Sequence, residues 1–154
     1  MRYVTLGTGD PGESVGVIDP TAYLARLPEL AEDLPSGARA FATDPGHYDF
    51  SGRRCVKDLT PHEVRHVGDR AELRLRHNCW KHDEDLVVRY EGVSRFHVDT
   101  AEVCDVCTLG EVILDEVLPH AEGCSHEIAC RTGTLVVVCR DLVAGWVAAG
   151  CPEA

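Results

Sequence analysis

The spacing of apolar residues predicts one helix near the start of the chain. Residues 19–37 (DPTAYLARLPELAEDLPSG) repeat apolar side chains every three to four positions, as in a helix with one buried face. Asp19 suits the N-cap and Pro20 the first helical position, while Pro28 indicates a kink or an early end. The expected buried stripe is Tyr23, Leu24, Leu27, Leu30, Ala31 and Leu34.

Beyond residue 56, apolar and polar residues mostly alternate, which is typical of strands with one solvated face. The alternating segments are 71–77, 85–93, 111–118, 126–130 and 134–142. RTGT at 131–134 is a suitable hairpin turn between the last two. This part of the chain is therefore expected to form an antiparallel sheet.

Three further short segments, 3–6, 15–18 and 38–43, are interpreted as strands. The expected fold class is α+β: a predominantly antiparallel β-sheet or sandwich with one N-terminal helix packed on it. A length of 154 residues suits a single domain. Within it, residues 1–55 form a strand–helix–strand part and residues 56–150 the antiparallel part.

Two segments resemble each other weakly. Residues 62–77 and 126–141 each begin with His-Glu and an aliphatic residue, pass a Gly-containing turn and end in an alternating strand. This similarity favours two equivalent hairpins, although chance or shared β-propensity explains it equally well.

Composition and charge indicate the cellular compartment of the protein and the kind of partner it would bind. No apolar run is long enough to span a bilayer, and the first residues lack a signal sequence, so we expect a cytoplasmic protein with mostly free thiols. A net charge of −11 disfavours nucleic acid and anionic membranes and favours a basic protein partner. Unpaired edge strands are compatible with a homodimer.

A zinc-like ligand frame follows the middle strands. Cys104, Cys107, His120 and Cys124 have the spacing C-x2-C-x12-H-x3-C, and thiolates and imidazole suit tetrahedral zinc. The segment between them alternates like a strand and is acidic, which argues against a DNA-reading finger. The leading expectation is therefore no cofactor, with zinc on these four residues as the alternative. A redox role for the Cys104–Cys107 pair is disfavoured because no helix is expected after Cys107.

A Gly-rich segment near the start fits a nucleotide-binding pattern on spacing alone. Residues 7–12 (GTGDPG) match G-x-G-x-x-G, but the following residues read as a strand, where the fingerprint requires a helix. We interpret the segment as a hairpin loop.

The stretch HNCWKHDED at 77–85 is rich in groups that could perform chemistry. Cys79 with His77 or His82 could form a nucleophile–base pair, which makes a small-molecule enzyme with a pocket near this stretch a further hypothesis. Its Asn, Lys and Asp content, between two alternating segments, favours an exposed loop.

Three neighbouring pairs, His62-Glu63, His126-Glu127 and Asp115-Glu116, also invite an acid–base interpretation. Adjacent side chains of a strand point to opposite faces of the sheet, so the two members of a pair cannot both point into one catalytic site. We interpret these pairs as solvated strand ends and assign no catalytic residues.

WKHDEDLVVRYEGVSRF and LDEVLP followed by HEIACRTGTLVVVCRDL resemble segments of small bacterial β-rich proteins of unknown function. The N-terminal stretch IDPTAYLARLPELAEDLPSGARAFATDPGHYDF resembles that of uncharacterised actinobacterial proteins. The β-rich proteins are loosely similar to bacterial toxin-immunity proteins. The resemblance implies a β-rich fold and a non-catalytic function. Together with the charge, it favours an acidic cytosolic protein-binding module, immunity-like in character, that binds a basic protein. The surplus of cysteines departs from the pattern.

Overall fold

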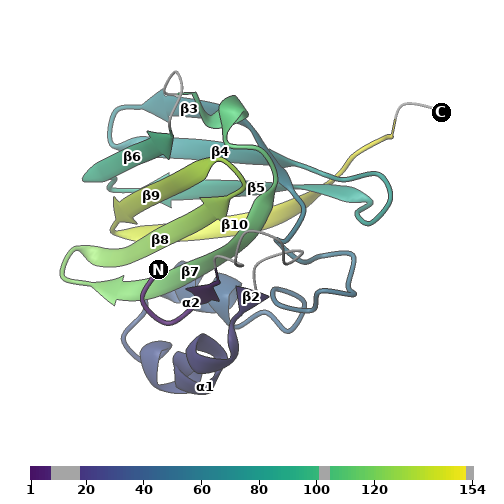
Figure 1. Ribbon diagram of the computed structural model, residues 1–154. Helices are drawn as coiled ribbons and strands as arrows, with labels where there is room; N and C mark the ends of the chain where they lie inside the picture. The colour runs from purple at the N-terminus through teal and green to yellow at the C-terminus, as the bar shows by residue number, and fades with distance from the viewer. Residues whose placement is uncertain (8–17, 101–104, 152–154) are drawn as a thin grey trace.

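The computed structural model describes residues 1–7, 18–100 and 105–151 (Figure 1). Its helices are α1 (Thr21–Leu30), α2 (Ser36–Ala42) and the short 3-10 helix η1 (Val106–Thr108). Its strands are β1 (Thr5–Leu6), β2 (Ile18–Asp19), β3 (Thr60–Val67), β4 (Arg70–Arg76), β5 (Glu84–Glu91), β6 (Arg95–Thr100), β7 (Val112–His120), β8 (Gly123–Cys130), β9 (Gly133–Cys139) and β10 (Asp141–Ala148).

Two four-stranded antiparallel sheets make up most of the structure, with strand orders β10-β5-β4-β3 and β6-β9-β8-β7. Figure 1 shows them overlapping, with the helices gathered beside β7. Inward-facing residues of both sheets belong to one buried apolar cluster, which includes Leu73 and Val88 from one sheet and Val117 and Leu135 from the other. The predicted antiparallel sandwich is therefore confirmed. Strands β1 and β2 form a separate two-stranded ribbon.

The two sheets exchange strands. β3, β4 and β5 are successive neighbours in one sheet, but β6 crosses to the other and pairs with β9. Likewise, β7, β8 and β9 are neighbours, and β10 crosses back to pair with β5. The crossings meet where Arg140 N donates to Glu91 O at 2.9 Å. Gly92 has φ +63° there, and a Cβ on it would lie 2.9 Å from the Arg140 Cβ, so a side chain is excluded. Each sheet therefore contains one strand, β10 or β6, that directly follows a strand of the other sheet.

The predicted helix forms, with shifted ends. α1 begins one residue after Pro20, and the Asp19 carboxylate accepts a hydrogen bond from Thr21 N at 2.9 Å. The helix runs through Pro28 and ends at Leu30. The Tyr23 hydroxyl donates to Val117 O of β7 at 2.8 Å, which fixes α1 to the sandwich. None of the helices among the described residues has the length and apolar character needed to cross a membrane.

Two predictions in the N-terminal part are wrong: a single helix, and a strand at 38–43. Residues 36–42 form α2, which buries Ala38, Phe41 and Ala42. Its N-cap residue, Pro35, provides no side-chain cap. Instead, the Asp141 carboxylate of β10 accepts from Gly37 N at 3.2 Å and Ala38 N at 2.9 Å. The sequence pattern missed α2 because its cap comes from the far end of the chain.

A buried polar network connects α2, β5, β7 and β8. One carboxylate oxygen of Asp115 lies 2.7 Å from His47 Nε2, and the other lies 2.9 Å from His126 Nε2. His126 Nδ1 lies 2.9 Å from the Tyr90 hydroxyl, and His47 Nδ1 lies 3.0 Å from Phe41 O. His47, Asp115 and His126 are at most 2% exposed. These side chains tie the two sheets and the helical segment together.

The interpretation of the acidic and histidine pairs as solvated strand ends is wrong for His126 and for Asp115-Glu116. Glu116 is buried on the opposite side of β7, where it accepts from the backbone N–H groups of Arg2, Tyr3 and Val4 at 2.6–2.9 Å. The two neighbours point to opposite faces, as expected of a strand. Both faces of β7 are covered, which the alternation could not reveal.

The two similar sequence segments form hairpins in different positions. One forms β3–β4 and the other β8–β9, with their turns at the expected places. β3 is an edge strand of its sheet, whereas β8 is internal to the other. The hairpins are therefore not equivalent parts of the fold.

Candidate metal centre

The stretch 77–85 is mainly the loop between β4 and β5, as predicted, and it lies against the segment that follows β10. β10 pairs with β5 up to Ala148, opposite Glu84. One residue later, Ala149 N donates to Asp83 O at 3.3 Å. Figure 1 shows the loop and the segment after β10 at the same side of the molecule. The topology thus brings the end of β10 to a loop about seventy residues earlier in the chain.

This arrangement gathers a histidine and two cysteines. His77 Nε2 lies 3.4 Å from Cys79 Sγ and 3.4 Å from Cys151 Sγ. The three ligand atoms all lie within 4.8 Å of one another, and no other such group of His, Cys, Asp or Glu occurs among the described residues. The imidazole is buried, while both cysteines are exposed.

Asp85 fixes the orientation of the His77 ring. Its Oδ1 lies 2.8 Å from His77 Nδ1 and also accepts from the His77 backbone N–H at 2.9 Å. Burial alone would raise the pKa of Asp85, but these bonds from His77 lower it below its usual value. An ionised carboxylate on Nδ1 holds the proton there, so the Nε2 lone pair points at the two sulfurs.

The loop that carries His77 and Cys79 is held by contacts of Lys81 and His82 with residues 55–58. Lys81 Nζ donates to Asp58 Oδ2 at 3.1 Å and to Lys57 O at 3.2 Å, and its side chain is only 7% exposed. His82 Nε2 lies 3.0 Å from Cys55 O, and burial lowers the pKa of this imidazole. A neutral His82 donates from Nε2 and accepts from Asn78 N at Nδ1. These contacts hold the loop in one conformation.

The spacing of the three ligand atoms suits a tetrahedral metal ion. Sulfur at about 2.3 Å and nitrogen at about 2.0 Å from zinc, near the tetrahedral angle, lie about 3.5 Å apart. The two observed Nε2–Sγ distances of 3.4 Å match this value. A carboxylate on the far nitrogen of a metal-binding histidine is the usual supporting contact.

The ligand frame expected from the sequence falls only partly on described residues, and those three residues do not lie together. Cys104 lies outside the described residues. Cys107 is exposed and donates to His62 O at 2.9 Å, beside the turn between β8 and β9. His120 is at the far end of β7, a nine-residue strand that spans about 27 Å. Cys124 is buried, with its Sγ 3.6 Å from Cys139 Sγ. The structure therefore does not bring Cys107 together with His120 and Cys124.

The sequence indicated only two of the three residues of the observed cluster. His77 and Cys79 belong to a stretch that stands out by composition, but Cys151 lies about seventy residues later, after the last strand. No short-range spacing connects them. Only the pairing of β10 with β5 places Cys151 beside the loop, and this pairing depends on the strand exchange.

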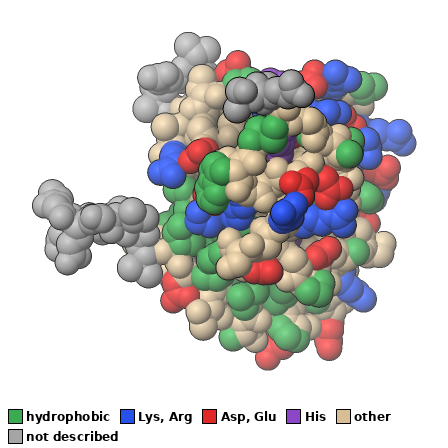
Figure 2. Space-filling model, turned by 90° about the vertical axis from the view of Figure 1, so that its right-hand side faces the viewer, with side chains coloured by type: hydrophobic (Ala, Val, Ile, Leu, Met, Phe, Trp, Pro, Cys, Tyr) green, Lys and Arg blue, Asp and Glu red, His purple; other side chains and the backbone are tan. Residues whose placement is uncertain are grey.

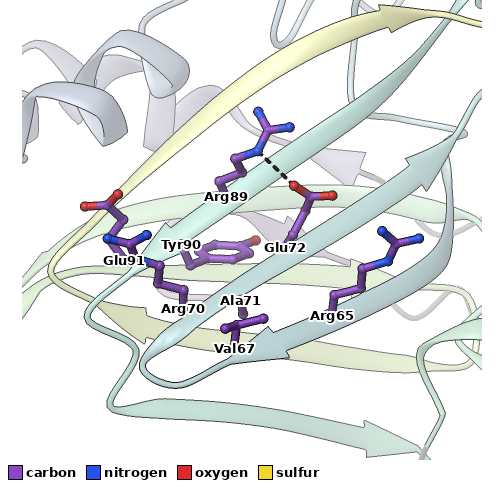
Figure 3. Close-up of a pocket in the computed structure, with 8 residues that line it drawn as sticks. All are labelled: Arg65, Val67, Arg70, Ala71, Glu72, Arg89, Tyr90 and Glu91. Atoms are coloured by element: carbon purple, nitrogen blue, oxygen red, sulfur yellow. Dashed lines mark hydrogen bonds and ion pairs between the residues drawn. The ribbon is translucent and has the colours of Figure 1, made fainter.

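A concave surface of about 420 Å³ lies on the β3–β4–β5 sheet, away from this group (Figure 3). Arg65, Arg70 and Arg89 line it together with Glu72 and Glu91. Arg89 Nε donates to Glu72 at 2.8 Å, as the dashed line in Figure 3 shows, and Arg65 Nε donates to Glu63 at 2.9 Å. Two of its three arginines are thus already neutralised, so this surface is a weaker candidate site.

Half of the eight histidines are buried, and half are exposed. In Figure 2, basic and acidic side chains are interspersed over the visible face, and little histidine colour reaches the surface. Four histidines, His47, His77, His82 and His126, are buried. Of these, His77 alone has a ring nitrogen directed at exposed sulfur atoms.

Comparison with known proteins gives no relative. No protein-family model, no curated protein and no solved structure matches this chain. Function is therefore inferred from the geometry of the described residues.

Proposed function

We propose that this protein binds a thiophilic metal ion, with Zn²⁺ the first choice, through His77 Nε2, Cys79 Sγ and Cys151 Sγ. The observation that carries the proposal is the pair of 3.4 Å distances from one oriented imidazole nitrogen to two cysteine sulfurs. Two sulfurs and one nitrogen exclude Mg²⁺ and Ca²⁺, which prefer oxygen ligands, and favour zinc or copper(I).

Three protein ligands leave one position of a tetrahedral ion for water or another small ligand. Both cysteines are exposed, so solvent reaches the ion. Closed structural zinc sites use four protein ligands, and this group offers three among the described residues. The geometry thus favours an exchangeable or reactive ion over a purely structural one.

Zinc titration against a competing chelator tests the proposal. The reduced protein should bind about one equivalent, and Cys79→Ser, Cys151→Ser and His77→Gln should each weaken binding at least about tenfold. Cys107→Ser is the matched control, because Cys107 is also exposed but lies away from the group. Absence of binding, or binding unaffected by both Cys79→Ser and Cys151→Ser, would refute the site.

Cobalt(II) provides a direct view of the ligands. Co²⁺ in a tetrahedral thiolate site gives intense sulfur-to-metal absorption, which the wild-type protein should show. The band should lose intensity in Cys79→Ser and in Cys151→Ser and persist in Cys107→Ser. An octahedral, weakly absorbing cobalt complex would contradict a two-thiolate site.

Binding of a basic protein partner and an immunity-like role stay predictions from charge and resemblance, as does a small-molecule enzyme near residues 77–85. Loss of a captured partner as salt is raised would support the first.

A further inference from the structure

We propose that Cys79 and Cys151 form a reversible disulfide when a peroxide oxidises the protein, and that closing this bond releases the metal ion. This inference rests on the proposed metal site. It adds a modification site and makes metal binding depend on the redox state of the cell.

The two sulfurs are close, and one of them stands on a segment that can adjust. Their Sγ atoms lie within 4.8 Å, and a disulfide needs about 2.05 Å. Cys79 belongs to the loop anchored by Lys81 and His82. Cys151 lies beyond the end of β10, directly after Gly150, around which no atom would restrict a Cβ. A small rotation at this glycine can close the gap without disturbing either sheet.

Exposure distinguishes this pair from the other close cysteines. Cys124 Sγ and Cys139 Sγ are 3.6 Å apart, but both residues are fully buried between the sheets. Cys55 is also fully buried. A peroxide reaches only exposed sulfur readily. Cys107 is exposed, but its partner in the structure is the backbone oxygen of His62.

A peroxide oxidises the Cys79 and Cys151 sulfurs to a disulfide in two steps. One of the two sulfurs attacks a peroxide oxygen; the O–O bond breaks, and the departing hydroxide takes a proton to become water. The resulting sulfenic acid is attacked by the second sulfur; the S–S bond forms, the S–O bond breaks, and hydroxide again leaves as water after protonation. Starting from the metal-bound thiolates, the two protons come from solvent. The sulfurs lose two electrons and the peroxide gains two.

Disulfide formation removes two of the three ligands. His77 alone then faces the ion, and a single imidazole binds zinc far more weakly than two thiolates with an imidazole. A dithiol reductant restores both sulfurs and with them the site. Metal release and disulfide formation should therefore occur together and reverse together.

The experiment treats zinc-loaded protein with hydrogen peroxide while a chromogenic chelator reports free zinc. Peptide mapping by mass spectrometry locates the disulfide. We expect release of about one equivalent of zinc in step with a Cys79–Cys151 bond, and rebinding after dithiothreitol. Cys107→Ser should behave like the wild type. Cys151→Ser should form no such bond, and metal-free wild-type protein should still form it.

The outcomes separate the two proposals. Zinc that stays bound through oxidation, or release together with a different disulfide, overturns the redox inference and leaves the metal site standing. Failure of the reduced protein to bind zinc overturns the metal site and the coupling with it, and the metal-free arm then shows whether the cysteine pair alone is redox-active.

Discussion

At the residue scale, the metal affinity of His77 depends on Asp85. The carboxylate holds the proton on Nδ1 and increases the electron density at Nε2. Asp85→Asn keeps the size of the side chain but removes its charge. We expect zinc affinity to fall about 10–100-fold, measured by competition with a chelator.

Asp83→Asn provides the control for this change. Asp83 lies in the same loop and forms an ion pair with Arg53, with both side chains well exposed. Removing its charge should leave zinc affinity within about twofold, because exposed pairs contribute little. Equal losses in the two variants would mean that the overall charge of the loop, and not the orientation of His77, governs binding.

Asp115 is the second residue whose pKa is set by its surroundings. Burial would raise the pKa of this carboxyl, but contacts with His47 and His126 outweigh burial and hold the pKa well below its usual value. Both ring nitrogens of His47 face oxygen atoms, Nδ1 toward Phe41 O and Nε2 toward the Asp115 carboxylate. Burial keeps the pKa of Tyr90 well above its usual value, so its hydroxyl donates to His126.

Asp115→Asn should therefore lower the free energy of unfolding by about 3–5 kcal/mol at pH 7, because the buried network loses the charged carboxylate that contacts both His47 and His126. Since the folded pKa of Asp115 is depressed, its stabilisation is complete above about pH 4 and is lost as the pH falls below that value. Urea unfolding at several pH values should show the variant and the wild type converging in acid. A constant difference across the pH range would contradict this assignment.

At the scale of elements, helix α2 depends on a carboxylate from another element. Asp141 of β10 caps Gly37 N and Ala38 N, where Pro35 provides no side-chain bond. Asp141→Ala should lower the free energy of unfolding by about 1–2 kcal/mol, measured by urea denaturation. Asp83→Ala, an exposed carboxylate outside any helix, should change it by less than about 0.5 kcal/mol. Equal effects would mean that Asp141 does not act as a cap.

The hydrophobic pattern of the sequence predicted most of the strands, but it missed one helix and the covered faces of β7. Alternation correctly indicated most strands of the sandwich, and it works best where one face of the strand is solvated, as in β4 and β6. It failed at Asp115 and Glu116, where both faces of β7 are covered, and at α2, whose cap is distant in sequence. His77 and Cys79 stood out by composition. Cys151 did not, because its place in the group depends on the pairing of β10 with β5.

At the scale of the whole molecule, strand exchange should make unfolding a single transition. Each sheet contains a strand that directly follows a strand of the other sheet, β10 after β9 and β6 after β5, so neither sheet can lose its structure alone. With Trp80 replaced by Phe, fluorescence of Trp146 in β10 reports on one sheet, and far-UV circular dichroism reports on both. The two urea curves should coincide. A sheet that melts separately would give two midpoints.

The exchange also sets the order in which the chain can complete its fold during synthesis. β5 leaves the ribosome about fifty residues before its neighbour β10, a delay of about 3–10 s at usual translation rates. During that time its edge, like that of β6 before β9 appears, offers unpaired backbone groups to any passing strand. Nascent chains of this protein should therefore depend on chaperones until translation has passed β10.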